Sequence, residues 1–206
     1  STMGKSVQHV NLTGGEPFLR SDIFEILRAY FDNANVNSIL INTNGSYPKR
    51  ISDLVDNLNK FYPDKTVITQ FSIDSYPEEH DKIRKIPGLF QKTMESFKIV
   101  KDKGIKVIPS IALTCTQENF KKINEIYEFM KNKHNVKRFS AILVRDEGVY
   151  KTPEPLKKEL LQSYKALIER LYKDRNSGEL LNFYKKNSFM SRVINEKEKI
   201  QHENNI

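Results

Sequence analysis

The chain has 206 residues, of which 38% are hydrophobic and 29% charged, and its formal net charge is +8. This composition fits a globular protein that is long enough to bury the core of one domain. A single cysteine, Cys115, excludes a disulfide framework, a cysteine-rich zinc site and, within these residues, an iron–sulfur cluster.

Targeting signals and charge clusters narrow the class further. No run of about 18 apolar residues predicts a membrane span, and the first residues lack the pattern of a signal peptide. We therefore expect a cytoplasmic protein with no membrane partner. The positive charge is spread over helical patterns as short lysine pairs, which we interpret as solvated helix faces rather than a nucleic-acid surface.

Five β-rich segments alternate with helical patterns along the chain. The predicted strands are residues 7–12, 38–42, 66–73, 105–113 and 136–144. Apolar residues at helical spacing predict helices around residues 23–31, 51–58, 90–100, 123–130 and 160–171, and a further helix over 179–199, while residues 76–88 are predicted as a polar loop. Repeats of this length, about 30 residues, indicate parallel strands with right-handed crossovers. A doubly wound sheet and a barrel both fit.

In both architectures the functional side chains gather at the carboxyl ends of the strands. Polar clusters follow all five predicted strands, at residues 13–18, 43–45, 72–75, 114–116 and 145–148. Loops between strands and helices are also polar because they cap helices. Spacing alone therefore leaves a structural and a functional interpretation open.

The first cluster, Gly14-Gly15-Glu16-Pro17, is more specific. Two glycines allow a ligand to approach the backbone, Glu16 adds a carboxylate, and Pro17 stiffens the exit. This combination suits an ammonium group held by carbonyls and a carboxylate, whereas the glycine patterns that bind phosphate are absent. Taken alone, the tetrapeptide also fits an ordinary tight turn.

The segment from Asn11 to Arg20 resembles the GGEP region of radical S-adenosylmethionine (SAM) enzymes. Two further segments resemble the family in the same order, namely residues 41–45 and residues 71–75 with 79–84 and 88–90. The last pattern is typical of the branch of peptide and protein maturases with C-terminal auxiliary-cluster (SPASM/twitch) domains. The resemblance covers residues 6–150 approximately, and three motifs in register make it specific.

This resemblance implies an α/β fold: a partial (β/α) TIM-like barrel of parallel strands that lacks the first strand–helix unit of a (β/α)6 radical SAM core. We expect residues 1–175 to form the truncated core and residues 176–206 a helical tail or a linker toward a missing domain. In this family a [4Fe-4S] cluster binds SAM and cleaves it reductively to a 5′-deoxyadenosyl radical, which abstracts hydrogen from a substrate.

Carried over position by position, the resemblance implies that ten residues bind SAM: Gly14, Gly15, Glu16, Pro17, Asn44, Ser72, Asp74, Arg84, Val144 and Arg145. The glycines and the glutamate would meet the methionine amino group, and the asparagine would line the pocket. The serine and the aspartate would approach the ribose and methionine portions, and Arg84 the SAM carboxylate. The last two residues end the strand that flanks the adenine.

Some of these residues also have structural interpretations. Asp74 can cap the loop that follows it, and Asn44 with the next glycine can form a turn. Arg84 can pair with one of the neighbouring carboxylates, which are Glu78, Glu79 and Asp81.

The cysteine pattern departs from the family. Radical SAM enzymes hold their cluster with three cysteines in a C-x-x-x-C-x-x-C loop upstream of GGEP, but only 13 residues precede Gly14 here and none is cysteine. Cys115 follows a later strand, where we predict a small buried hydrophobic residue. We expect SAM and a [4Fe-4S] cluster in the full-length protein, no cluster in this chain, and no activity from it alone.

Two alternatives stay open: a cluster-less binding module on the same fold, and an RNA-modifying member of the family suggested by the +8 charge. The maturase resemblance favours modification of a peptide or protein, with small-molecule modification as the other class. Loss of the first strand would expose the edge Val7–Leu12, where we expect self-association.

Overall fold

A computed structural model describes residues 7–34, 36–144 and 152–176. Its five parallel strands form one sheet in the order β1-β2-β3-β4-β5. Their bounds are His9–Leu12, Ser38–Thr43, Thr66–Ile73, Val107–Cys115 and Phe139–Leu143. Because each strand pairs with the next one in the sequence, the sheet is a curled half-barrel, and the reversal of strand order that marks a doubly wound sheet does not occur among the described strands.

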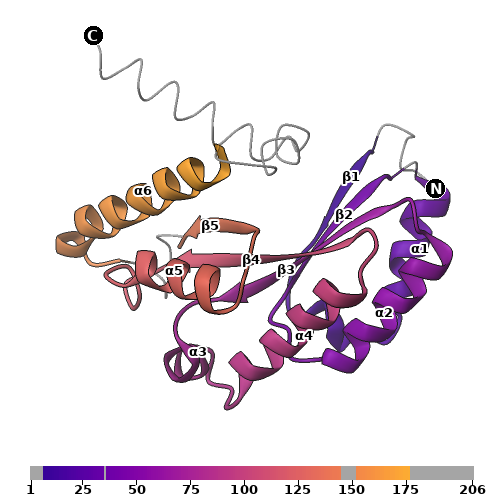
Figure 1. The fold of residues 1–206 in the computed structure, drawn as a ribbon, viewed down its shortest axis with the longest axis horizontal. Coiled ribbons are helices and arrows are strands. Elements are labelled where there is room, and N and C mark those ends of the chain that lie inside the picture. The colour runs from indigo at the N-terminus through magenta and orange to yellow at the C-terminus, as the bar shows by residue number, and fades with distance from the viewer. Residues whose placement is uncertain (1–6, 35, 145–151, 177–206) are drawn as a thin grey trace, which may run out of the picture. The chain divides into compact units, whose positions relative to one another are not determined.

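The helices follow the strands as the repeat predicts. They are α1 (Ile23–Asn33), α2 (Pro48–Phe61), α3 (Pro77–Arg84), α4 (Leu89–Lys103), α5 (Ile123–Lys133) and α6 (Glu154–Asn176), with a short 3-10 helix, η1, at Pro17–Leu19. Figure 1 shows α1, α2 and α4 side by side along one face of the sheet. The partial barrel predicted from the family resemblance is thus confirmed.

The core lies between that face and its helices. Alternate strand residues are fully buried there, as expected for the covered face of a parallel sheet: Ile39, Ile41, Val67, Phe71, Ile111 and Leu113. The helices on that face, α1, α2 and α4, turn apolar residues toward them, for example Ile23, Leu27 and Phe31 of α1. Proline in the first turn of α2 starts that helix without losing a needed hydrogen bond.

The predicted polar loop at 76–88 is wrong in part, because residues 77–84 form α3. This helix has little apolar periodicity, and His80 is its one fully buried side chain. Its ends carry other signals: proline and two glutamates in the first turn, and Lys82 and Arg84 in the last.

Four of the five strands also differ from the prediction at their ends: β1 starts at His9 rather than at residue 7, and β2 extends to Thr43 rather than to residue 42. The fourth strand begins at Val107 rather than at residue 105 and extends to Cys115. Ile105, which the apolar run had included, is 66% exposed. The fifth strand is shorter than predicted and starts at Phe139.

The chain divides into two compact units, residues 1–164 and 165–206, and α6 runs across the boundary. The first unit contains all described strands. Within it, the Tyr164 hydroxyl donates to the carbonyl of Ala141 at 3.4 Å, so the start of α6 lies beside β5. The helix predicted over residues 179–199 and the tail or linker at 176–206 fall almost wholly outside the described residues. None of the described helices is long and apolar enough to cross a membrane.

Candidate functional site

The carboxyl ends of the five strands lie along one edge of the sheet, which we call the rim. The strand register pairs Thr43 with Phe71, Ile73 with Leu113, and Cys115 with Leu143. The polar clusters that follow β2, β3 and β4 are therefore neighbours, and the loop after β1 stands next to the end of β2.

Gly14 and Gly15 form the open part of the rim after β1. Gly14 has φ +133°, a conformation that side-chain-bearing residues rarely adopt. Both glycines are exposed, and a Cβ added to either would meet no described atom within 4 Å. Their backbone is thus accessible to a ligand.

Glu16 is held by donors from two parts of the chain. Its Oε1 accepts from the Phe18 backbone N–H at 3.0 Å and from the Thr43 hydroxyl at 2.7 Å. Its Oε2 accepts from the Asn44 backbone N–H at 2.7 Å. The carboxylate therefore links the loop after β1 to the end of β2, and none of these three donors is charged.

The end of β2 continues as a turn anchored to α4. Asn44 Oδ1 accepts from the Ser46 N–H at 2.9 Å, so the predicted turn is present. The Asn44 carbonyl accepts from the Thr93 hydroxyl at 2.6 Å. Gly45 has φ +75°, and a Cβ there would lie 2.8 Å from the Thr93 Cα, so glycine is required both by the conformation and by the close approach of α4.

The short helix η1 fixes the far side of the first loop. Pro17 occupies its first turn, and Phe18 is fully buried. From α2, Arg50 Nη1 donates to the carbonyls of Phe18 and Leu19 at 2.6 and 2.7 Å. This part of the loop therefore has anchors besides the Glu16 carboxylate, which accepts from the Phe18 N–H.

Asp74 and Arg84, both predicted site residues, pair with each other. Asp74 is 3% exposed. The Arg84 Nε donates to its Oδ2, and Nη2 donates to Oδ1 at 3.0 Å. Arg84 itself keeps a third of its side chain exposed. The guanidinium and the carboxylate thus form a bidentate ion pair at the end of β3.

Two of the three carboxylates that were considered as partners for Arg84, Glu79 and Asp81, have other contacts. Glu79 accepts from the Lys122 ammonium at 2.7 Å, and this bond is the largest cause of the lowered pKa of Glu79. Asp81 accepts from the backbone N–H groups of Gly88 and Phe90 at 2.6 and 2.8 Å, so it caps the start of α4.

His80 supports the end of β3 in its neutral form. Its Nδ1 accepts from the Asp74 backbone N–H at 3.2 Å, which requires an unprotonated nitrogen. Burial lowers the pKa of His80, so the 3.6 Å approach of Nδ1 to the Asp74 carboxylate is no ion pair. Among the described atoms, its buried Nε2 has no hydrogen-bond partner.

One residue that sequence reasoning missed completes this part of the rim. Asn119 is 2% exposed, and its amide donates to the carbonyls of Asp74 and Thr114, both at 2.7 Å. Its Oδ1 accepts from the Thr116 N–H at 2.8 Å. Asn119 therefore ties the ends of β3 and β4 together.

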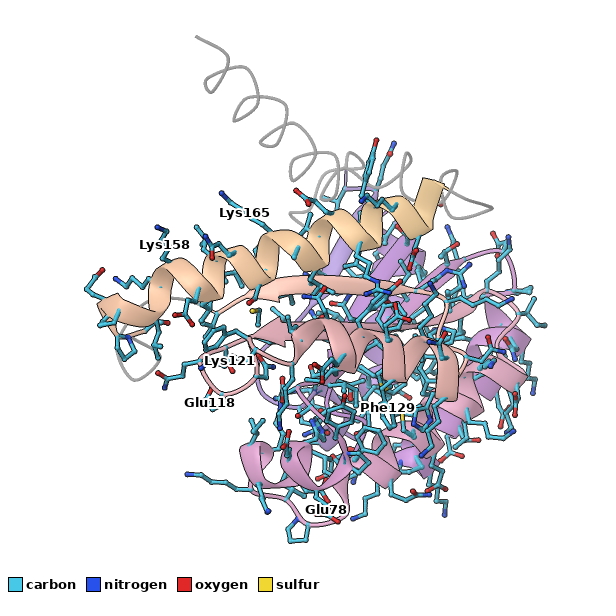
Figure 2. All side chains as sticks on the ribbon, turned by 60° about the vertical axis from the view of Figure 1, so that its left-hand side comes forward. Glu78, Glu118, Lys121, Phe129, Lys158 and Lys165 are labelled. Atoms are coloured by element: carbon cyan, nitrogen blue, oxygen red, sulfur yellow. The ribbon has the colours of Figure 1, made fainter. Side chains whose placement is uncertain are left out.

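Aromatic side chains pack together next to the end of β3. Phe129 on α5, labelled in Figure 2, packs against Tyr76 with ring centroids 5.0 Å apart. Phe90 on α4 packs edge-on to His80 at 6.0 Å and also contacts Phe129. These contacts join α3, α4 and α5 under the end of β3.

The remaining predicted residues lie further along the rim. Ser72 is half-buried on the face of β3 that the helices leave uncovered. The Val144 N–H donates to the Cys115 carbonyl at 3.0 Å, which places Val144 at the rim beside β4. Arg145 lies outside the described residues.

The uncovered face of the sheet mixes amide and hydroxyl side chains with apolar ones such as Leu40, Ile68 and Ile108. Asn42 donates to Asn11 at 2.9 Å, and Gln70 donates to Ser140 at 2.9 Å. Among the described strand residues on this face there is no Asp, Glu, Lys or Arg. His9, near its opposite edge, has a pKa lowered by burial.

Cys115 is fully buried, and burial raises its pKa to about 11. The prediction of a buried small residue is confirmed. The described residues contain no group of three or more His, Cys, Asp and Glu that could hold a metal ion. Since a [4Fe-4S] cluster needs several thiolates, the residues of this chain do not fit that cluster.

Comparisons with known proteins agree with this geometry. The family model of the radical SAM superfamily matches residues 2–130. An AdoMet-dependent heme synthase of Methanosarcina barkeri is 29% identical over 132 residues, which are 64% of this chain and 35% of that protein. A GTP 3',8-cyclase of Listeria monocytogenes is 26% identical over 62% of this chain and 36% of that protein. The chain thus spans about a third of these relatives.

The solved structures with a similar fold include anSMEcpe with bound AdoMet, at a TM-score of 0.58 and 21% identity over 82% of this chain and 45% of that chain. Another is anSMEcpe with AdoMet and the Kp18Cys peptide, with the same TM-score and 20% identity, covering 82% and 48%. At this level of identity the likeness concerns the fold.

Proposed function

The chain belongs to the radical SAM superfamily of enzymes, and we propose that its rim is the SAM-binding part of such an enzyme. One observation carries the proposal: the open Gly14–Gly15 backbone stands next to the Glu16 carboxylate, which only uncharged donors hold. Exposed carbonyls beside an uncompensated negative charge suit an ammonium group, such as the amino group of SAM.

The donor set at this point fits that ligand. A carboxylate offers about four lone-pair directions, and three are taken by Phe18, Thr43 and Asn44. We assign the carbonyls of Gly14 and Gly15 to the SAM amino group, with the charge of Glu16 beside them.

Other predicted residues extend the site along the rim. We propose that Ser72 approaches the ribose and that Val144 flanks the adenine, because both lie beyond the β2 end on the same edge. Arg84 uses two of its donors on Asp74, and a guanidinium has about five. Its exposed part is therefore our candidate for the SAM carboxylate.

The cluster requires ligands that this chain lacks. In the family, a [4Fe-4S] cluster supplies the electron that cleaves SAM to a 5′-deoxyadenosyl radical. This chain of 206 residues has one cysteine, which is buried and has a raised pKa. It therefore cannot supply three thiolates. We propose that it is inactive alone and that its own residues bind and orient SAM.

For the substrate, we propose a peptide or protein segment. The uncovered face presents amides and hydroxyls, groups that hydrogen-bond to peptide amides. It offers no Lys or Arg among the described strand residues, whereas a triphosphate such as that of GTP calls for Lys, Arg or a metal ion. The peptide bound in one structural neighbour is consistent with this class.

The proposal is tested with the full-length product of the reading frame, reconstituted anaerobically with iron and sulfide. We expect reductant-dependent formation of 5′-deoxyadenosine from SAM, measured by mass spectrometry, and none from the printed chain treated alike. A full-length product that takes up no cluster, or forms no 5′-deoxyadenosine, would favour the cluster-less binding module instead. Salt-dependent RNA binding would favour the RNA-modifying alternative.

We also propose that the chain self-associates at Val7–Leu12. β1 pairs only with β2 among the described strands, so its other edge presents unpaired backbone groups. Light scattering should detect a dimer or larger species. A monomer at all concentrations would contradict this.

A further inference from the structure

We propose that the edge of the sheet opposite the rim is a docking surface for an acidic segment of a partner protein. This edge, which we call the amino edge, is formed by residues 60–65, 101–106 and 131–138. Each of these segments runs from the last turn of a helix, α2, α4 or α5, to the start of the next strand. Because the strands are parallel, all three segments lie at the amino ends of the strands.

The amino edge carries most of the net charge of the chain. Its three segments contain nine Lys or Arg residues and two Asp residues, which gives +7 of the total of +8. The rest of the chain is therefore nearly neutral. The lysine pairs of the sequence suggested evenly solvated helix faces, whereas the fold collects the excess positive charge at one edge. Such an asymmetry favours an anionic partner.

Contacts between side chains show that the segments are neighbours. At the end of α4, the Lys101 ammonium donates to the Asn135 carbonyl in the connection to β5, at 3.5 Å. The Lys103 ammonium pairs with Asp56 of α2 at 2.8 Å. The ends of these two helices and the chain before β5 thus form one continuous surface.

Helix dipoles explain only part of this charge. Lysine in the last turn of a helix compensates the negative end of the dipole, and α2, α4 and α5 all have such lysines. Lys106 and Lys137 lie outside the helices, in the connections to β4 and β5. Both are exposed, and neither forms a hydrogen bond or an ion pair with a residue that the structure describes. Their ammonium groups are available to carboxylates of a partner.

An apolar side chain stands among these lysines. Ile105 is 66% exposed, the largest exposed fraction among the described large hydrophobic residues. Its N–H donates to Asn59 Oδ1 at 3.1 Å, and Asn59 Nδ2 donates to the Lys103 carbonyl at 2.8 Å. A Cβ on Gly104 would lie 2.1 Å from the Val107 carbonyl oxygen, so the turn requires glycine there. A well-defined turn therefore presents Ile105 at the surface.

This combination favours a protein segment over a nucleic acid. Single-stranded nucleic acids bind to proteins largely by stacking on aromatic rings. Phe61 and Tyr62 of the amino edge have other contacts: the Lys60 ammonium lies 4.9 Å from the Phe61 ring centroid, and Tyr62 packs against Phe31 at 5.0 Å. Ile105 offers an aliphatic contact instead. The surface thus suits a segment in which Asp or Glu residues flank an apolar residue.

The test titrates the full-length product of the reading frame with a labelled glutamate-rich peptide that has leucine at its centre, and follows binding by fluorescence anisotropy. We expect binding, and we expect Lys106→Glu and Lys137→Glu each to weaken it about fivefold, because each replaces an exposed ion pair by a repulsion. A wild-type protein that does not bind the peptide would overturn the inference.

Two control variants separate the amino edge from net charge. Lys92 in the first turn of α4 and Lys121 before α5, the latter labelled in Figure 2, are exposed lysines on the rim side of the sheet. Lys92→Glu and Lys121→Glu make the same change of charge and should bind the peptide as wild type does. If they weaken it as much as Lys106→Glu does, only the net charge matters and the inference is wrong.

A second peptide, with serine in place of leucine, tests the contact with Ile105. Wild type should prefer the leucine peptide about threefold, as expected for partial burial of an apolar side chain. Ile105→Ser should lose this preference and bind the serine peptide as wild type does. Because Ile105 is exposed, its thermal unfolding should be unchanged. Equal affinity of wild type for both peptides would contradict an apolar contact and overturn the docking of such a segment.

A single-stranded RNA of the same formal charge provides the competing outcome. We expect wild type to bind it more weakly than the leucine peptide at the same salt concentration, and tighter binding of the RNA would overturn the inference in favour of a nucleic acid. Formation of 5′-deoxyadenosine should be unchanged in Lys106→Glu and Lys137→Glu, because the amino edge lies opposite the rim. Failure of the proposed SAM chemistry would leave the expected peptide affinities unchanged, so the two proposals fail separately.

Discussion

Two neighbouring parts of the rim each hold a carboxylate, and the groups that contact the two carboxylates differ. At the end of β3, Asp74 is almost fully buried and pairs with the Arg84 guanidinium. At the first loop, Glu16 is only half-buried and accepts from two backbone N–H groups and a hydroxyl. The first carboxylate has a counter-charge, and the second has none among these donors.

This difference suggests a structural role for Asp74 and a ligand-binding role for the loop around Glu16. A buried carboxylate costs much free energy unless it is paired. The Asp74–Arg84 pair is therefore needed for the stability of the fold. A carboxylate held by uncharged donors keeps its negative charge, which favours a nearby cation from outside the chain. We therefore expect changes at β3 to act mainly on stability, and changes at the first loop to act mainly on ligand binding.

The largest expected effect is at the Asp74–Arg84 pair. Asp74→Ala removes the buried member of the pair and leaves Arg84, a third of whose side chain is exposed, without its partner, so it should lower the free energy of unfolding by about 2 kcal/mol. Asp22→Ala breaks an Arg–Asp pair of the same bidentate kind at the surface, where little change is expected. Urea unfolding compares the two variants. Equal losses would contradict the view of the β3 end as a buried anchor.

The next effect tests how the end of β2 is fixed. In Gly45→Ala the new Cβ would clash with the Thr93 backbone of α4 and the residue would keep a positive φ, so we expect a loss of about 2 kcal/mol. Gly14→Ala has the conformational strain but open space, and should lose less. Thermal unfolding orders the two variants, and a larger loss for Gly14→Ala would show that the first loop is the more tightly packed part.

Because His80 supports the end of β3 in its neutral form, we expect the free energy of unfolding to depend on pH. Burial lowers the pKa of His80, with Asp74 opposing that shift and Arg84 adding to it. The native state thus favours the neutral ring, so its stabilising contribution is complete above the unfolded pKa near 6.5 and is lost as the pH falls toward the lower folded value.

Between about pH 7.5 and pH 5.5, wild type should lose about 1 kcal/mol more than His80→Gln. Urea titrations at both pH values measure this difference. His134 also has a pKa lowered by burial, so some pH dependence should remain in the variant. Identical curves for the two proteins would show that His80 is not buried in its neutral form.

The smallest effect concerns the end of β4. Cys115 is fully buried with a pKa raised to about 11, so the native thiol should react with a disulfide reagent at least ~100-fold more slowly than the unfolded chain at neutral pH. The protonated thiol is favoured in the native state, so its contribution is present at neutral pH and is lost as the pH rises past the ordinary thiol value toward 11. Rapid native labelling would instead place Cys115 on the open side of the rim.

Much of the fold could be predicted from the sequence because each strand and most helices carry a strong apolar period. α3 could not, since its one fully buried residue is a histidine and its signals lie in end charges. The choice between barrel and doubly wound sheet needed the family resemblance, because the apolar period does not report strand order.

The positions of residues along the rim could be predicted from the sequence, but their hydrogen-bond partners could not. The segment Gly14–Pro17 and Asn44 were chosen correctly as rim residues, yet nothing in the sequence links Glu16 to Thr43, which lies 27 residues away. The pairing of Asp74 with Arg84 spans a helix that was predicted as a loop. Long-range hydrogen bonds depend on register, and a single sequence does not contain it.

The proposed function places the SAM amino group at the carbonyls of Gly14 and Gly15, beside a Glu16 carboxylate that accepts from Thr43 and Asn44. A crystal structure of the reconstituted full-length protein with SAM tests it most directly. We expect the amino nitrogen at about 2.7–3.2 Å from the carbonyl oxygens of Gly14 and Gly15, with the Glu16 carboxylate still accepting from Thr43 and Asn44. An amino group bound elsewhere, or a Glu16 side chain turned away from β2 to meet it, would contradict the account.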